Sequence, residues 1–193
     1  MNFNFLIGTG AIVLIVIAVI VLLLLIAFIS TLNSLKKLNV RVNEAFSDID
    51  VALEKRYDQL TKLLSTVKGY AKHEAEVLEN IVKLRNGSYK DASLQEKMEL
   101  DSKITQVVDK VSLIREAYPD LKASQNFNTL MLSINDIEEH ISAARRNYNA
   151  NVRNLNERIV TFPTNIVASI GGVKKRDFFE AEEKKKEDVK IEF

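Results

Sequence analysis

The sequence contains no cysteine and no tryptophan, and only two prolines and six glycines occur among its 193 residues. Without cysteine, the chain can form no disulfide, no thiolate metal site and no cysteine nucleophile. Proline and glycine are the residues that interrupt helices most often, so their scarcity favours an all-α chain. The 27 basic and 26 acidic side chains nearly balance, which gives no indication of a nucleic-acid partner.

Charge is also missing from the N-terminal region, where the first charged residue is Lys36. The apolar run through Phe5, Leu14, Leu22 and Ile29 is longer than the roughly 20 residues that a helix needs to cross a bilayer. No basic residue precedes the run and no small-x-small cleavage site follows it, so we expect a retained anchor rather than a signal peptide. We therefore interpret residues 1–30 as a short tail and a transmembrane anchor, with the lipid bilayer as a partner.

Three basic residues, Lys36, Lys37 and Arg41, follow the span, and none precedes it. The positive-inside bias then places the short N-terminus outside and the rest of the chain in the cytoplasm. The same side chains are candidate contacts for lipid headgroups, each worth about 1 kcal/mol beside an anionic leaflet. The alternative, which we favour, is that they only set the topology.

Apolar residues recur every three or four positions after the span, as in an amphipathic helix. The row begins Leu35, Leu38, Val42, Phe46, Ile49, Leu53 and Tyr57. The spacing predicts that the anchor continues without a break as one helix to Arg85, and that Asn86–Gly87 ends it.

Three further helices are predicted from local signals. A capping box at Ser93–Glu96 starts the second helix, which ends at Tyr118–Pro119. The third begins near residues 124–126 and is broken by Pro163, and a short fourth helix, Pro163–Ile170, is closed by Gly171–Gly172. The expected fold is all-α: an antiparallel three- or four-helix bundle over residues 31–172, continuous with the transmembrane helix. The charged segment 173–193 is expected to be disordered.

The fourth helix carries a small apolar face formed by Phe162, Ile166, Val167 and Ile170. If the second helix returns toward the membrane and the third runs away from it, this face caps the far end of the bundle. The alternative is a helix that lies on the membrane surface. We expect the cap.

Residues that could carry chemistry do not form a recognised pattern. Asp48 and Asp50 are two positions apart on a helix and point in different directions, so they cannot share a metal ion. His73 lacks the second histidine of the zinc-protease helix, since position 77 is valine, and His140 lacks the spacing of di-iron bundles. We expect no catalytic residue, metal ligand or cofactor, and no enzymatic activity.

Several segments resemble the LemA family of bacterial single-pass membrane proteins. They are Val42–Val51, Arg56–Asp58, Val67–Glu74, Ala144–Asn149, Asn154–Asn156 and Phe162–Pro163, and with the anchor the resemblance covers residues 5–172. The family usually has tryptophan where Phe46 stands and Pro-Asn where Thr61–Lys62 stands, so a family-typical kink near Thr61 is in doubt. The resemblance implies an antiparallel bundle in the bacterial inner membrane without established enzymatic activity, and a related branch associated with internal bacterial membranes.

Helix lengths suggest how the protein could assemble. A second helix that folds straight back from Asn86–Gly87 covers only about Leu60 to Leu84, which leaves the row from Leu35 to Tyr57 without a partner. Burying such side chains is worth about 1.5–3 kcal/mol each, so we hypothesise that the row packs against other copies in a homo-oligomer. The alternative within one chain is that the third helix begins earlier, near Tyr118, and covers more of the row. Such a homo-oligomer would organise or shape the membrane. The alternative is an adaptor whose bundle or tail binds an unidentified membrane or cytoplasmic protein.

Overall fold

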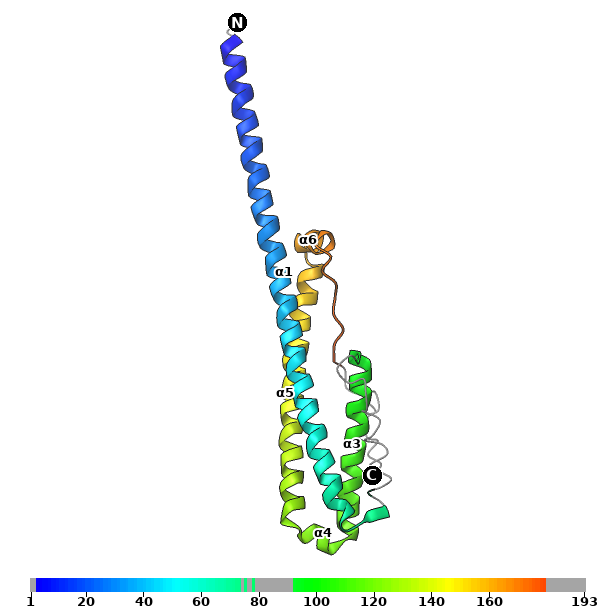
Figure 1. Cartoon of the computed structure of the whole chain (residues 1–193). Coiled ribbons are helices and arrows are strands. Elements are labelled where there is room, and N and C mark those ends of the chain that lie inside the picture. The colour runs from blue at the N-terminus through cyan, green and yellow to red at the C-terminus, as the bar shows by residue number, and fades with distance from the viewer. Residues whose placement is uncertain (1–2, 74, 76–77, 79–91, 180–193) are drawn as a thin grey trace, which may run out of the picture. The chain divides into compact units, whose positions relative to one another are not determined.

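The computed structural model describes the chain at residues 3–73, 75, 78 and 92–179, and its side chains from residue 10 on. All secondary structure in these residues is helical (Figure 1). Two compact units are formed by residues 1–43 with 150–177 and by residues 44–149 with 178–193. Two long helices, α1 and α5, run through both units. The predicted all-α fold, with an anchor helix continuous with a bundle helix, is confirmed.

Helix α1 extends from Phe3 to Lys68, which makes it about 100 Å long at 1.5 Å per residue. It continues through Thr61 without interruption and ends at Lys68. The next residue, Gly69, donates its N–H to Thr66 O at 3.2 Å. The prediction of one helix to Arg85 is therefore wrong, because tight three-residue bonds at Gly69 and Tyr70 close the helix first. The predicted stop at Asn86–Gly87 lies outside the described residues.

The remaining helices follow the predicted boundaries closely. They are α3 (Leu94–Ala117), α4 (Pro119–Ala123), α5 (Gln125–Val160) and α6 (Thr164–Ile170). Ser93 and Glu96 form the predicted capping box, in which the Ser93 amide donates to Glu96 Oε2 at 2.7 Å. The short helix α4 was not expected as a separate element. It starts at Pro119, whose missing N–H is harmless at the first turn of a helix.

In the unit of residues 44–149, a continuous core joins α1, α3, α4 and α5. Its largest buried side chains include Leu60, Leu63, Leu64, Leu121, Phe127 and Ile134. Lys97 of α3 bonds Asp50, whereas Asn126, which follows α3 in sequence, bonds Thr66. Helix α3 therefore runs in the same direction as α1, and α5 runs antiparallel to both. The expectation that the second helix folds back along α1 is wrong.

In the unit of residues 1–43 and 150–177, the end of α5 and helix α6 pack against α1 (Figure 1). Leu35 and Val42 of α1, Val152 and Leu155 of α5, and Ala168 of α6 are buried. A side chain at Gly171 would overlap Leu32 Cδ1, so the end of α6 touches α1 directly after the apolar span. The predicted cap at the far end of the bundle is therefore wrong.

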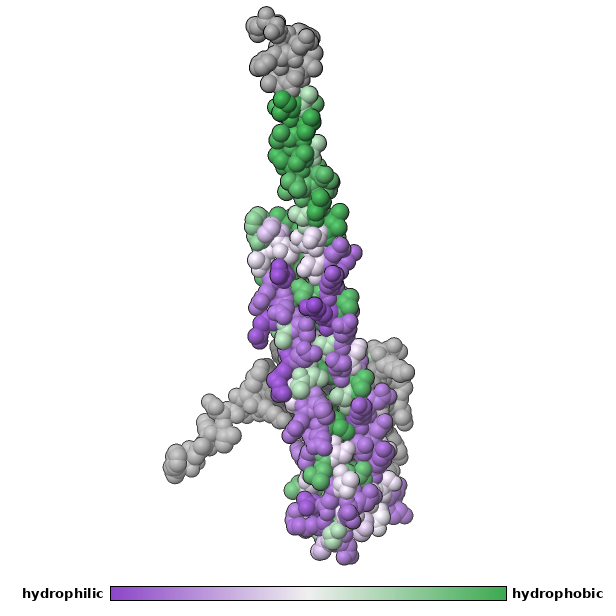
Figure 2. All heavy atoms as spheres, turned by 90° about the vertical axis from the view of Figure 1, so that its left-hand side faces the viewer, coloured by the Kyte–Doolittle hydropathy of each residue, from purple (hydrophilic) through white to green (hydrophobic). Residues whose placement is uncertain are grey.

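The apolar part of α1 is exposed. Side chains from Ile12 to Ile26, and Ile29, are largely uncovered, and Figure 2 shows a continuous hydrophobic surface there. Among the described residues, one helix is long and apolar enough to cross a membrane, with a mean hydropathy of 3.8 over its most apolar window. This agrees with the predicted span through Leu14, Leu22 and Ile29. Phe5 lies in α1, outside the residues whose side chains are described.

The row proposed for self-association is largely buried within the chain. Leu35, Val42, Ile49 and Leu53 are buried, and Leu38, Phe46 and Tyr57 are half-buried. The premise that this row lacks a partner is wrong, because side chains of α5 pack against α1. For example, the centre of the Phe46 ring lies 5.8 Å from the centre of the Tyr148 ring of α5. Homo-oligomer formation itself stays a prediction.

Candidate functional site

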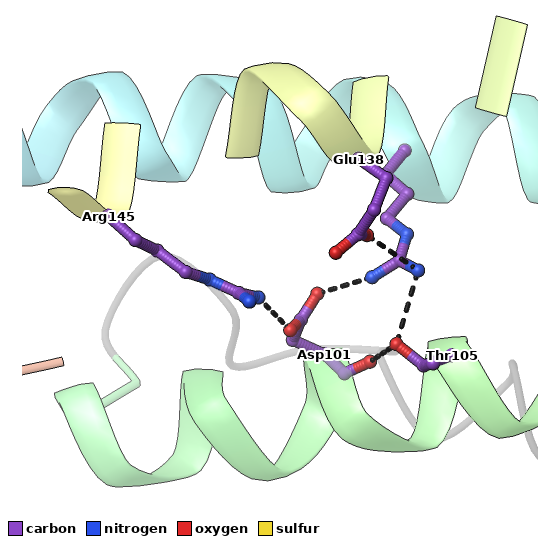
Figure 3. A network of polar contacts seen from close by, with 5 residues as sticks. Asp101, Thr105, Glu138 and Arg145 are labelled. Atoms are coloured by element: carbon purple, nitrogen blue, oxygen red, sulfur yellow. Dashed lines mark hydrogen bonds and ion pairs between the residues drawn. The ribbon is translucent and has the colours of Figure 1, made fainter. Parts of the chain in front are cut away.

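A network of charged side chains lies inside the unit of residues 44–149 (Figure 3). Arg56 of α1 is almost fully buried and donates to Asp101 Oδ1 of α3 at 2.6 Å and to Thr105 Oγ1 at 3.1 Å. Its second amino group also lies 2.8 Å from Glu138 Oε2 of α5. Arg145 of α5 pairs with the other oxygen of Asp101. The network thus joins all three long helices.

A second buried cation, Lys97, lies on α3 one helical turn before Asp101. Lys97 Nζ donates to both carboxylate oxygens of Asp50, at 2.9 and 2.7 Å. The same ammonium group lies 4.7 Å from the centre of the Phe46 ring, within the range of a cation–π interaction. Phe46 in turn contacts Tyr148 of α5. Lys97 therefore connects α3 with an aromatic pair that joins α1 and α5.

The chain after α6 is fastened beside this network. The Asn149 amide donates to Phe179 O at 2.9 Å, and Phe179 N–H donates to Asn149 Oδ1 at 2.8 Å. The Arg145 guanidinium lies 4.8 Å from the Phe179 ring, which is buried. Residues 180–193 lie outside the described part, and the predicted domain boundaries at residues 30 and 173 stay predictions.

A shallow groove between α1 and α5 lies on the outside of the same unit. It has a volume of about 260 Å³, with an apolar floor and a polar rim. The lining residues are Asp48, Val51, Ala52, Lys55, Ile137, His140 and Ala144. Asp48 opens onto this groove, whereas Asp50 pairs with Lys97, so the two carboxylates have different neighbours, as their spacing predicted.

Comparison with known proteins decides the family. The LemA family model matches residues 45–193. The chain belongs to the LemA family. It is 31% identical over 163 residues to protein LemA of Metamycoplasma hominis, and the match covers 84% of this chain and 74% of that protein. Magnetosome proteins MamQ 1 and MamQ 2 of Paramagnetospirillum magneticum are each 31% identical over 65 residues, covering 34% of this chain and 24% of theirs.

Three of the six segments that carry the LemA resemblance meet at the buried charges. Phe46 comes from the first segment, Arg56 from the second, and Arg145, Tyr148 and Asn149 from the fourth. The structure brings them together through the contacts described above. Phe46, where the family usually has tryptophan, keeps an aromatic surface against Lys97 and Tyr148. In this LemA protein these motif residues therefore contribute to the packing of α1, α3 and α5.

Charge balance explains how the network is tolerated. Its cations are Arg56, Lys97 and Arg145, and its anions are Asp50, Asp101 and Glu138. A buried charge is strongly destabilising unless it is paired and hydrogen-bonded, whereas a fully paired set adds little net stability and fixes which groups face each other. The ion pairs therefore join α1, α3 and α5, while Arg56 Nε, Arg145 Nε and Glu138 Oε2 are buried without a hydrogen-bond partner among the described residues. No group of three or more metal-ligating side chains occurs in the described part of the chain.

The buried charges were not predicted from the sequence, although a signal for them was present. Arg56 stands three residues after Leu53 and four before Leu60, at a position of the apolar repeat. Asp101 stands likewise three residues before Ile104. A charged residue on the buried face of an amphipathic helix needs a partner of opposite charge on a neighbouring helix. The conflict of both residues with the apolar repeat is therefore a sequence signal for a buried ion pair.

The predicted headgroup contacts are placed consistently with either of their expected roles. Lys36, Lys37 and Arg41 are exposed on α1, directly after the span.

At the start of α3, hydrogen bonds from the Ser93 amide and hydroxyl lower the pKa of Glu96 below its ordinary value. On the surface near α4, the ammonium group of Lys122 lowers the pKa of Glu116.

Proposed function

We propose that this LemA protein is a non-enzymatic scaffold that is anchored in a bacterial cell membrane and organises it. The observation that carries the proposal is the behaviour of α1. Ile29 is 55% exposed and Leu35 is 1% exposed, so the lipid-type surface becomes packed core within six residues, or about 9 Å. The anchor and the packed part of α1 are thus one continuous helix, and this suits a protein that holds a packed helical unit close to a bilayer.

The buried charges support a structural role. Each cation of the network faces an anion inside the helix interface, and the resulting contacts join α1, α3 and α5. Two relatives that match 65 residues are named magnetosome proteins, which agrees with a role in internal bacterial membranes. For an anchor in the inner membrane, Lys36, Lys37 and Arg41 favour a helical domain on the cytoplasmic side.

Reconstitution of the full-length protein into vesicles tests this function. A membrane organiser changes vesicle shape, or gathers into patches, as the ratio of protein to lipid rises, and electron microscopy detects either effect. Ile49→Asp places a charge in the core and should abolish the effect, whereas Val51→Asp changes an exposed residue of the same helix and should preserve it. Unchanged vesicles with uniformly dispersed wild-type protein would contradict the proposal.

Self-assembly needs a surface other than the predicted row, because the members of that row are committed to contacts within the chain. Size measurement of the intact protein in mild detergent tests it directly. A monomeric wild type would restrict the scaffold to one chain and its lipids.

The adaptor is a second candidate, and the groove between α1 and α5 is the observation that favours it. Its apolar floor and polar rim suit one helix of a partner protein. Val51→Asp then separates the two functions, since Val51 lines the groove: an adaptor would lose its partner, whereas the scaffold would keep its effect on vesicles. An adaptor that uses its tail would instead lose function when residues 173–193 are deleted.

A further inference from the structure

Helix α6 is fixed to the part of α1 that emerges from the apolar span. Gly171, which follows α6, leaves room for the side chain of Leu32. Leu32 is three residues, or about 4.5 Å along the helix, from Ile29, where the exposed apolar run ends. Both belong to the same compact unit. A helix packed there lies at the level where a bilayer passes from hydrocarbon to headgroups.

One face of this segment consists of large apolar side chains without cover. Phe162 is 75% exposed, Ile166 is 52% exposed and Ile170 is 69% exposed. Ile166 and Ile170 are four residues apart in α6 and lie along one side of it, whereas the opposite side packs inward through the buried Ala168; Phe162 lies in the turn before α6. Val160, the last residue of α5, adds another exposed apolar side chain beside Phe162. Such a cluster beside a membrane span is better matched by lipid than by water.

The charges of the same unit are mostly basic, with Glu157 and Asp177 as its two acidic residues. Between Ser30 and Asn43 the basic residues are Lys36, Lys37 and Arg41, and no acidic residue occurs. Between Ile159 and Arg176 the basic residues are Lys174, Lys175 and Arg176, again with no acidic residue. Anionic headgroups attract such a basic cluster.

Hydrogen bonds hold the second basic segment in place. Arg176 N–H donates to Asn156 Oδ1 at 2.9 Å, and the Asn156 amide donates to Arg176 O at 2.8 Å. The Arg176 guanidinium also bonds the Asn43 side chain of α1. Lys174 and Lys175 are exposed beside these bonds. Lys174 and Lys175 therefore lie on the stretch between Gly171, which faces Leu32, and Arg176, which is fixed beside Asn43, eleven residues or about 16 Å farther along α1.

We propose that α6 is a second membrane contact, in which Phe162, Ile166 and Ile170 enter the interface of the bilayer that holds α1, while Lys174 and Lys175 contact anionic headgroups. The occupant of this face is the lipid surface, because the span continues into the residues that α6 packs against. The inference rests on the proposed anchoring of α1. It adds that the unit of residues 1–43 and 150–177 contacts the membrane at two points, through α1 and through α6.

The absence of native cysteine allows a direct test with single-cysteine variants of the full-length protein. Ile166→Cys and Ile170→Cys each receive an environment-sensitive fluorophore, and the protein is reconstituted into vesicles of phosphatidylcholine mixed with phosphatidylglycerol. Leu24→Cys in the span is the control for insertion, and Leu113→Cys, an exposed apolar residue of α3, is the control for a water-facing label. Quenching by aqueous iodide and by a lipid-attached nitroxide is measured for each.

We expect labels at positions 166 and 170 to resemble the label at 24, with blue-shifted emission, severalfold weaker iodide quenching than at 113, and quenching by the nitroxide. Water-like behaviour at 166 and 170 together with a lipid-like label at 24 would overturn the proposal and leave the anchor intact. A water-like label at 24 would overturn the anchoring on which both proposals depend. Circular dichroism establishes that each labelled variant keeps its helices.

A variant that changes only the lysines tests the headgroup contact. With the label kept at Ile170→Cys, Lys174→Gln combined with Lys175→Gln should reduce the ratio of docked to undocked label about fivefold for each lysine in anionic vesicles. In vesicles of phosphatidylcholine alone the same changes should have no effect. An equal effect in both kinds of vesicle would contradict headgroup recognition.

Discussion

The substitution Ile49→Ala tests whether the apolar row of α1 belongs to the core of one chain. Ile49 is 0% exposed, and its neighbours Ala45, Ala52 and Leu53 are buried on the same face. Truncating a buried isoleucine to alanine removes apolar contact and leaves a cavity, at a cost of about 2–5 kcal/mol. The total unfolding free energy of a domain is only about 5–15 kcal/mol, so this loss is large.

Val51→Ala is the matched control, since Val51 lies two positions away on the same helix and is 52% exposed. Its effect should stay within about 0.5 kcal/mol, because an exposed valine has few contacts to lose and alanine favours a helix slightly. The assay is urea unfolding in mild detergent, followed by far-UV circular dichroism. With slopes of about 1–3 kcal/mol per molar urea, a loss of about 3 kcal/mol lowers the midpoint by about 1–3 M.

Unfolding at several protein concentrations distinguishes a core within one chain from an interface between copies. Because the row is buried in a single chain, the loss caused by Ile49→Ala should be the same at every protein concentration. If the row instead joined copies, the unfolding midpoint of the wild type would rise with concentration and the variant would weaken that rise. Equal stability of Ile49→Ala and Val51→Ala, or a loss that disappears on dilution, would refute the reasoning.

Three further changes probe the charges, the helix start and the contact of α6. Arg56→Ala removes the buried cation between Asp101 and Glu138 and should reduce the unfolding free energy by about 1–3 kcal/mol, measured by urea unfolding, because Asp101 keeps Arg145 and Glu138 is partly exposed. Ser93→Ala removes the cap of α3, should cost about 0.5–2 kcal/mol, and should raise the pKa of Glu96 toward its ordinary value in an NMR titration. Because that pKa is lowered in the folded state, the contribution of Glu96 to stability is present above its unfolded pKa of 4.5 and is lost as the pH falls through the lowered value. Gly171→Ala should cost about 1–3 kcal/mol through overlap with Leu32, and a second change, Leu32→Ala, should restore part of the loss.

Helix boundaries were predictable because the signals that set them are local. The capping box at Ser93 starts α3, and Pro163 ends the third helix region at the expected place. Gly69 was overlooked because the apolar repeat continues past it through Ala71 and Leu78, both of which are buried. The apolar repeat indicates which face of a helix is buried. That face stays the same when one turn of the helix is interrupted, as at Gly69. The backbone hydrogen bonds at Gly69 and Tyr70 ended α1 without disturbing the pattern.

The partners of buried charges were beyond the sequence because they depend on packing between distant segments. Arg56 and Asp101 are 45 positions apart, and nothing in their immediate neighbours pairs them. Their positions within the apolar repeats could have shown that each needs a partner. The choice of partner requires the direction of α3 relative to α1, which an apolar stripe does not encode, since a stripe packs equally well in either direction.

The direction of α3 also decides what α6 can reach. If α3 had folded back along α1, α5 would have run away from the membrane and α6 would have capped the far end. Lys97 beside Asp50 and Asn126 beside Thr66 fix the opposite arrangement, so α5 runs back toward the span and brings Gly171 against Leu32. The same apolar residues, Phe162 and Ile170, thereby change from a possible cap of a bundle to an uncovered face beside a membrane span. The contact of Gly171 with Leu32 is therefore the part of the fold on which the proposed second membrane contact depends.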